Sequence, residues 1–218
     1  MNRAARVAGA AYLISFVTVV AVEFGIQARL MVPGNSAQTA HNILAHQSLF
    51  RVGIAGDLVY CAGVFVLLTA LYVILEPVNR GIALLAALFR FVYTSMWLLA
   101  TTNLFNALRI LRTTDLQPFA PLYLGARSDL YYVGLLFGAL ASTLCAWLWL
   151  KSSYIPKGFA AFGVIASAWC VACTFVFILF PAFARVVNLW WFDMPMALFE
   201  IALSVWLLIK GLPKKVTP

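Results

Sequence analysis

Six long apolar segments dominate this sequence and limit it to very few folds. A helix needs about 20 mostly apolar residues to cross the hydrocarbon core of a bilayer, and each segment is about that long or longer. Turn-forming residues such as Pro33, Pro77 and Pro156 separate several of them. The sequence therefore predicts an all-α fold, a polytopic membrane helical bundle with six transmembrane helices in a single domain over residues 1–218. The predicted spans are 7–28, 49–75, 82–111, 130–150, 159–180 and 191–209.

The composition excludes a soluble domain. Apolar residues make up 64% of the chain and charged residues 10%, whereas a soluble domain usually has about 45–50% and about 25%. A soluble fold of 218 residues could not cover that much apolar surface, so the bilayer must be the main solvent. Membrane lipids are therefore the expected partners. Nucleic acid is not expected, because the chain has no basic run with interleaved aromatic residues.

The distribution of positive charge predicts that both termini lie in the cytoplasm. Cytoplasmic loops of membrane proteins carry an excess of Lys and Arg. With the N-terminus inside, the inner side has more cations than the outer side, and it holds all the lysines. The inner cations are Arg3, Arg6, Arg80, Lys151, Lys157, Lys210, Lys214 and Lys215, and the outer ones are Arg29, Arg112, Arg127 and Arg185. We therefore expect a multi-pass protein of the cytoplasmic (inner) membrane.

The sequence contains none of the strong motifs for catalysis or cofactor binding. It has no phosphate loop, no nucleophile elbow and no His-Glu-x-x-His zinc motif. His41 and His46 lie close together in the first outer loop, but no cysteine or carboxylate stands at ligand spacing. We therefore predict no metal and no cofactor. Apolar packing is the interpretation favoured for the cysteines, which are Cys61, Cys145, Cys170 and Cys173.

Ionisable residues inside the predicted spans mark where a function would lie. Each costs about 2.5–3.5 kcal/mol on insertion, so it normally faces a partner or a water-filled cavity. At about 1.5 Å per residue, Arg90 lies roughly 12 Å and Glu200 roughly 15 Å above the cytoplasmic ends of their helices. Because the two are close in depth and opposite in charge, we predict an ion pair. The ionisable residues of the spans are Glu23, Arg51, Asp57, Arg90, Arg109, Asp193 and Glu200.

A second polar layer is predicted nearer the outer ends of the helices. Glu23 lies roughly 24 Å and Asp57 roughly 27 Å above the cytoplasmic ends. We expect this layer to open toward the long outer loops and to supply the partners of the two carboxylates. The expected partners are Arg51, Arg109, Asn103, Asn106 and water.

The third span carries the clearest polar pattern. Arg90, Thr94, Trp97 and Thr101 recur at spacings of four, three and four residues, which places them on one face of a helix. In a bilayer such a face must turn inward. The candidate ligand-binding residues of the whole chain are Glu23, Arg51, Asp57, Tyr60, Arg90, Tyr93, Trp97, Asn103, Asn106 and Glu200.

Structural interpretations of the same residues remain open. Arg90 and Glu200 could form a purely structural ion pair. Charged groups of Arg51, Arg109 and Glu23 could extend to the membrane surface. Asp129 and Asp193 could cap the starts of their helices.

Several short runs match a known family of membrane proteins. They are Leu49-Phe50-Arg51 with Gly53, Asp57-Leu58 with Tyr60, Leu71-Tyr72, Pro77-Val78-Asn79-Arg80, Ala83-Leu84-Leu85 with Arg90, Asn103, Ser153-Tyr154-Ile155-Pro156, and Glu200 with Trp206-Leu207-Leu208-Ile209-Lys210-Gly211. At these positions, over nearly the whole chain, the sequence resembles the bacterial membrane family catalogued as domain of unknown function 4386. The resemblance implies a small helical protein of the bacterial inner membrane, and it implies no established activity.

Three functions are compatible with these features. We favour a protein whose polar, outward-opening cavity binds or moves a small hydrophobic or amphiphilic ligand or a lipid headgroup. The second hypothesis is an intramembrane enzyme acting on a lipid or isoprenoid, in which Asp57 or Glu23 donates a proton and aromatic faces stabilise a developing cation, by analogy with membrane terpene cyclases. The third is a structural or assembly role. The sequence does not decide whether the protein is an enzyme, nor its oligomeric state.

Overall fold

The computed structural model describes residues 2–180, 182–183, 187 and 190–213, and helices joined by turns and short loops make up this part of the chain. Arg185, Lys214 and Lys215, which entered the charge count, lie outside the described residues. The helices are α1 (Asn2–Val22), the π-helix η1 (Glu23–Gln27), α2 (Ala28–Leu30), α3 (Ser36–Ala45), α4 (Gln47–Leu75), α5 (Arg80–Leu111), the 3-10 helix η2 (Thr114–Phe119), α6 (Ala120–Ser152), α7 (Lys157–Leu179) and α8 (Trp190–Ile209).

The six predicted spans are confirmed. In the described part of the chain, six helical segments are long and apolar enough to cross a membrane, the first of them running without a break from α1 through η1 to α2. The fourth helix is longer than its predicted span, because α6 begins at Ala120 and the span was placed from residue 130. Pro121 lies in the first turn of α6, where the missing N–H of proline breaks no helical hydrogen bond. Arg127, counted above as a loop residue, therefore lies inside a helix.

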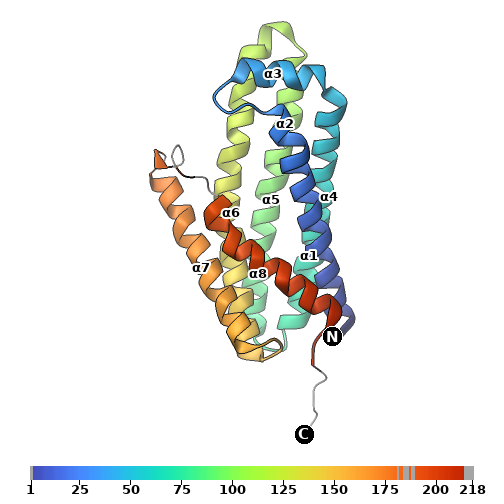
Figure 1. The fold of residues 1–218 in the computed structure, drawn as a ribbon, viewed down its shortest axis with the longest axis vertical. Coiled ribbons are helices and arrows are strands. Elements are labelled where there is room, and N and C mark those ends of the chain that lie inside the picture. The colour runs from blue at the N-terminus through green and yellow to red at the C-terminus, as the bar shows by residue number, and fades with distance from the viewer. Residues whose placement is uncertain (1, 181, 184–186, 188–189, 214–218) are drawn as a thin grey trace.

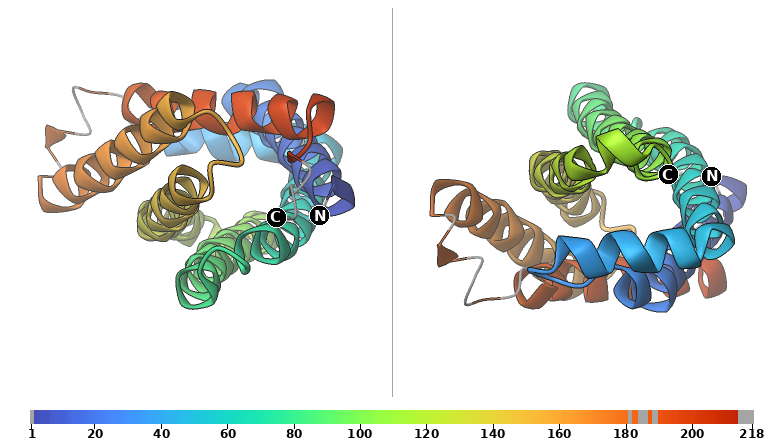
Figure 2. Two further views of the ribbon diagram at one scale, coloured as in Figure 1. Left: turned by 90° about the horizontal axis from the view of Figure 1, so that it is seen from below. Right: turned by 90° about the horizontal axis from the view of Figure 1, so that it is seen from above.

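The six long helices form a closed ring (Figure 2). Each packs against the next along the chain, and α8 returns to pack against α1. Figure 1 shows α8 crossing the bundle diagonally, whereas α1, α4, α5 and α6 run along its long axis. The two ends of the described chain meet, since the Leu212 N–H donates a hydrogen bond to Asn2 Oδ1 at 3.0 Å.

Glycines set how closely the helices of this ring approach. A Cβ atom at Gly56 would collide with Val22, and one at Gly63 would collide with Ser15, so these glycines let α4 lie close against α1. On α1, a Cβ at Gly9 would lie 2.7 Å from the carbonyl oxygen of Ser204 in α8. The small residues therefore close the ring at these crossings.

The first outer loop contains a helix that the sequence did not predict. Asn35 starts α3 as its N-cap, because its side chain accepts a hydrogen bond from the Gln38 N–H at 2.9 Å. Thr39 and Ile43 are buried on the inner face of α3. The helix lies across one end of the bundle (Figure 1).

Apolar clusters occupy both ends of the ring. Where α3 packs on the bundle, Ile43 of α3 and Phe50 of α4 are fully buried. They belong to the apolar cluster beneath α3, which consists of Leu30, Ile43, Phe50, Ile54, Leu104, Leu108, Leu111 and Ala120. A larger cluster that includes Trp149 and Leu75 fills the end where the termini lie. The first cluster covers the end at which the sequence predicted an opening. On α5, Arg90 thus lies between Ala86 of the larger cluster and Leu104 of the first.

The crossing of α1 and α8 can be tested at Gly9. We expect Gly9→Ala to lower the free energy of unfolding by about 1–3 kcal/mol, because its Cβ would meet the backbone of α8. The measurement is thermal unfolding in a neutral detergent. Gly125→Ala on α6 is the control, since nothing lies within 4 Å of the added Cβ, and it should keep or raise the unfolding midpoint. An equal loss in both variants would contradict the close crossing.

The cytoplasmic location of the termini can be tested by cysteine labelling. The four natural cysteines are buried, so an added surface cysteine would dominate the reaction. Ser36 and Gly81 are exposed at the starts of α3 and α5, at opposite ends of the bundle. We expect an impermeant maleimide added to intact cells to label Ser36→Cys and not Gly81→Cys. The reverse pattern would overturn the predicted orientation.

Candidate functional site

The polar face of α5 points into the bundle, as predicted. Arg90, Thr94, Trp97 and Thr101 are each at most 7% exposed. The two threonine hydroxyls donate to backbone carbonyls one turn earlier, at 2.7 Å and 2.9 Å. Their polarity is thus satisfied within the helix, which leaves the side chains of Arg90 and Trp97 to contact other helices.

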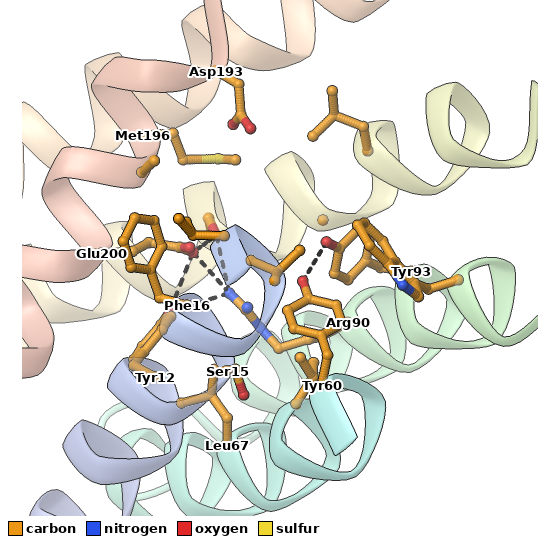
Figure 3. Close-up of a pocket in the computed structure, with 18 of the residues that line it drawn as sticks. Tyr12, Ser15, Phe16, Tyr60, Leu67, Arg90, Tyr93, Asp193, Met196 and Glu200 are labelled. Carbon is orange, nitrogen blue, oxygen red and sulfur yellow. Dashed lines mark hydrogen bonds and ion pairs between the residues drawn. The ribbon is translucent and has the colours of Figure 1, made fainter. Parts of the chain in front are cut away.

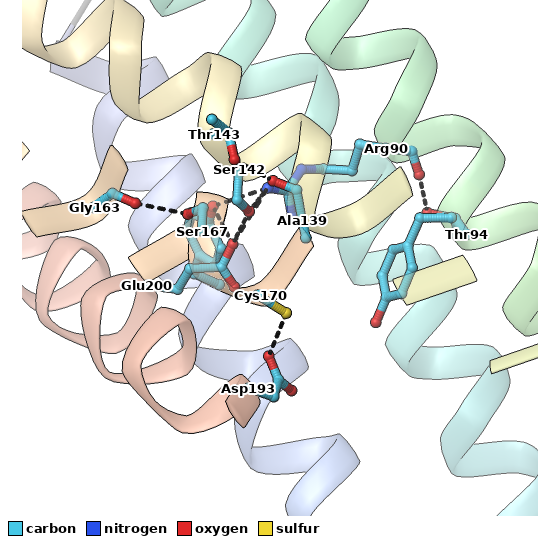
Figure 4. Close-up of polar contacts among 12 residues, drawn as sticks. Arg90, Thr94, Ala139, Ser142, Thr143, Gly163, Ser167, Cys170, Asp193 and Glu200 are labelled. Atoms are coloured by element: carbon cyan, nitrogen blue, oxygen red, sulfur yellow. Dashed lines mark hydrogen bonds and ion pairs between the residues drawn. The ribbon is translucent and has the colours of Figure 1, made fainter. Parts of the chain in front are cut away.

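The predicted ion pair between Arg90 and Glu200 is confirmed, and it belongs to a larger network (Figure 4). Arg90 Nη2 lies 3.3 Å from Glu200 Oε1, and it donates to Ser142 Oγ at 2.9 Å and to the Tyr12 hydroxyl at 3.3 Å. The hydroxyls of Tyr12 and Ser142 both donate to Glu200 Oε1, at 3.2 Å and 2.5 Å. The Arg90–Glu200 network therefore joins α1, α5, α6 and α8.

A cavity of about 130 Å³ lies beside this network, inside the ring of helices (Figure 3). A single water needs only about 10–15 Å³, so the cavity has room for a larger group. Side chains of α1, α4, α5, α6 and α8 line it, and most of them are apolar, such as Phe16, Leu67 and Met196. Two lining residues on the side of α1 are well exposed, Val20 at 37% and Phe24 at 57%.

Four aromatic residues form one wall of the cavity. The Trp97 ring lies at centroid distances of 4.7 Å from Tyr60, 6.0 Å from Tyr93 and 5.6 Å from Tyr131. The hydroxyls of Tyr60 and Tyr93 are 2.5 Å apart and share a hydrogen bond. A Cβ at Gly138 would lie 3.1 Å from the Tyr93 ring, so α6 packs closely against Tyr93 at this position. These contacts hold the aromatic wall in one arrangement.

Two carboxylates and one guanidinium face the same cavity. Arg90 and Glu200 pair with each other, whereas no ion pair of Asp193 occurs among the described residues. Asp193 Oδ1 lies 3.8 Å from Cys170 Sγ, and a thiol is a weak donor. Asp193 precedes Glu200 by seven residues, about two turns, so both lie on one face of α8. If both acids are ionised, the cavity carries one excess negative charge.

The carboxylates of the outer polar layer have other partners than predicted. Glu23 pairs with Arg127 of α6, and not with Arg51 or Arg109. Asp57 Oδ1 accepts a hydrogen bond from Trp97 Nε1 at 3.3 Å. The expected partners were wrong because Arg127 was assigned to a loop and because the depth of Trp97 did not show which way its indole N–H points.

Asp57 and Gln27 are more deeply enclosed than the other polar residues of this layer. Asp57 is 1% exposed and Gln27 is 3% exposed. Asp57 Oδ2 and both amide atoms of Gln27 have no hydrogen-bond partner within the described residues. Gln27 ends the π-helix η1, a local widening of the helix that is often found at functional sites.

The cavity contains half of the predicted site residues. It is lined by Tyr60, Arg90, Tyr93, Trp97 and Glu200. The other half lies away from it: Glu23, Arg51, Asp57, Asn103 and Asn106 are absent from its lining. Arg51 and Asn106 border a separate surface hollow together with Arg109 and Arg112. The two predicted polar layers are therefore not parts of one cavity.

Tyr12, Ser142 and the inward position of Asp193 were not among the features predicted from the sequence. Ser142 continues a four-residue spacing of small residues on α6 that starts at Gly134 and Gly138, a pattern typical of close helix packing. The seven-residue spacing of Asp193 and Glu200 was also visible in the sequence. Nothing in the sequence singles out Tyr12, because an aromatic residue in a first span is ordinary.

Comparisons with known proteins identify the family of this chain. A family model matches residues 7–211. The chain belongs to the family described as Domain of unknown function (DUF4386). A protein of Archaeoglobus fulgidus, described as an uncharacterized protein, is 30% identical over 142 residues. The match covers 65% of this chain and 73% of that protein. No solved structure matches this DUF4386 chain.

The Arg90–Glu200 network makes a prediction about stability. We expect Arg90→Leu to cost about 3–5 kcal/mol, because it leaves the Glu200 carboxylate in the membrane without its cation. The double variant Arg90→Leu/Glu200→Leu should recover a large part of that loss. Unfolding in a neutral detergent is the measurement.

The exposed pair of Arg80 and Glu76 is the control for this prediction. Its atoms are 3.5 Å apart and its side chains are 80% and 40% exposed. Arg80→Leu should therefore change the stability by at most about 1 kcal/mol. If Arg90→Leu were as mild as Arg80→Leu, the network would not hold the four helices together.

Proposed function

We propose that this protein binds a single-chain amphiphile of the membrane, such as a fatty or isoprenoid lipid, in the cavity inside its helix ring. We also propose that it does so in the cytoplasmic membrane, as its charge distribution predicts. One observation carries the proposal: a single cavity combines a mostly apolar wall with the Arg90–Glu200 network. An amphiphile is the class of molecule that matches both parts.

Access from the side, between α1 and α8, fits the arrangement of these two helices. They cross closely at Gly9 and Ser204, and Figure 1 shows α8 leading away from α1 beyond this crossing. Both helices contribute residues to the lining of the cavity, and Val20 on α1 is 37% exposed. Because the apolar cluster beneath α3 covers the end of the ring, lateral access replaces the outward opening expected from the sequence.

The Arg90–Glu200 network supplies donors and acceptors for a polar group. Glu200 Oε1 accepts three hydrogen bonds, and the Glu200 side chain is still 21% exposed. A hydroxyl or amine can therefore exchange hydrogen bonds with Glu200 while its chain follows the apolar wall. The enzyme hypothesis gains less support, since its two candidate acids, Asp57 and Glu23, do not line the cavity.

Photocrosslinking with hexadecanol that carries a diazirine in its chain tests the proposal. We expect the probe to label peptides of α1 and α8 that line the cavity, when it is added to the protein in lipid nanodiscs. Ala197→Trp should reduce this labelling several-fold, because Ala197 lines the cavity on α8 and the indole would fill the space. Mass spectrometry of the digested protein gives the labelled positions.

Ala202→Trp is the matched control on the same helix. Ala202 is exposed and does not line the cavity, so the same substitution there should leave the labelling unchanged. Uniform labelling of all lipid-facing helices, or labelling that Ala197→Trp does not reduce, would overturn the proposed function.

A further inference from the structure

We propose that the amphiphile bound in this cavity carries a positive charge, as an alkylammonium group held between Asp193 and the aromatic wall. The inference rests on the proposed function and names the chemical class of its ligand. It depends on the charge balance of the cavity and on the arrangement of the aromatic rings.

The charge balance leaves Asp193 as the acceptor of a cation. Arg90 is 5% exposed, and its Nη2 atom is bound to Glu200, Ser142 and Tyr12, so its charge is matched within the network. Asp193 has no cationic partner within 4 Å among the described residues. In surroundings of low dielectric constant, a carboxylate without a counter-ion attracts a cation strongly. A ligand ammonium would supply the missing partner.

The aromatic wall suits the same ligand. Tyr60, Tyr93, Trp97 and Tyr131 all line the cavity that Asp193 borders. Figure 3 shows the Asp193 carboxylate pointing into this space, which Tyr93 also borders. Aromatic faces attract cations within about 6 Å of the ring centroid, and several such rings around one space are the usual recognition site for methylated ammonium groups. An anionic headgroup would gain nothing from these rings and would be repelled by Asp193.

The cationic side chains in and near the cavity do not favour an anionic ligand. The guanidinium that would bind a carboxylate or phosphate is already paired with Glu200. The polar residues of the outer layer, where Arg127 pairs with Glu23, do not line the cavity. With Asp193 ionised, the excess charge within reach of a ligand is negative.

The test uses three diazirine probes with the same hexadecyl chain and different head groups: trimethylammonium, hydroxyl and carboxylate. In nanodiscs of zwitterionic lipid, we expect the trimethylammonium probe to label the cavity peptides about tenfold more efficiently than the hydroxyl probe. The carboxylate probe should label them least. Asp193→Asn should remove the advantage of the trimethylammonium probe and leave the labelling by the hydroxyl probe unchanged.

Two further variants separate charge and aromatic recognition from damage to the fold. Asp115→Asn removes an exposed acid outside the cavity, and it should leave the preference for the trimethylammonium probe intact. Trp97→Leu should reduce the preference, whereas Trp97→Phe, which keeps an aromatic face, should restore most of it. Labelling by the hydroxyl probe reports in every variant whether the cavity is still formed.

The outcomes distinguish the two proposals. If the hydroxyl probe labels the cavity and the trimethylammonium probe shows no advantage, the ligand is not a cation and the proposed function stands. If the preference is present but survives Asp193→Asn, the assignment of Asp193 is overturned. If none of the three probes labels the cavity peptides, the proposed function itself fails.

Discussion

The Arg90–Glu200 network is the interaction on which the rest of this structure depends. A guanidinium and a carboxylate inside a hydrocarbon layer are tolerable only when they meet each other and additional hydrogen-bonding groups. Here Tyr12 and Ser142 complete the network, so four helices converge on one nitrogen and one oxygen. This convergence requires α8 to return to α1, which closes the ring.

Closing the ring also creates the cavity. The helices meet around a central polar group, and glycines at their crossings fix the distance between them. Space remains where the side chains of the ring do not reach one another. The diagonal course of α8 keeps it against α1 at only one crossing, and the cavity borders the two helices beyond that point. Apolar clusters occupy both ends of the ring, which is why we propose lateral access for a membrane ligand.

Charge and aromatic surface together narrow the chemistry of such a ligand. Because Glu200 neutralises Arg90, Asp193 decides the sign of the charge that the cavity presents. The tyrosines and Trp97 line the same space, and their mutual contacts hold them there. These two features support a cationic amphiphile more than a neutral or anionic one.

The sequence by itself determined the six spans, the inward polar face of α5 and the pairing of Arg90 with Glu200. Hydropathy, helical period and depth are local properties, and they can be read along the chain. Tertiary structure alone decided that Glu23 pairs with Arg127, that Asp57 meets Trp97 and that Asp193 faces the cavity. Depth places a residue at a level in the membrane, but only the order and tilt of the packed helices decide which side chains at that level meet.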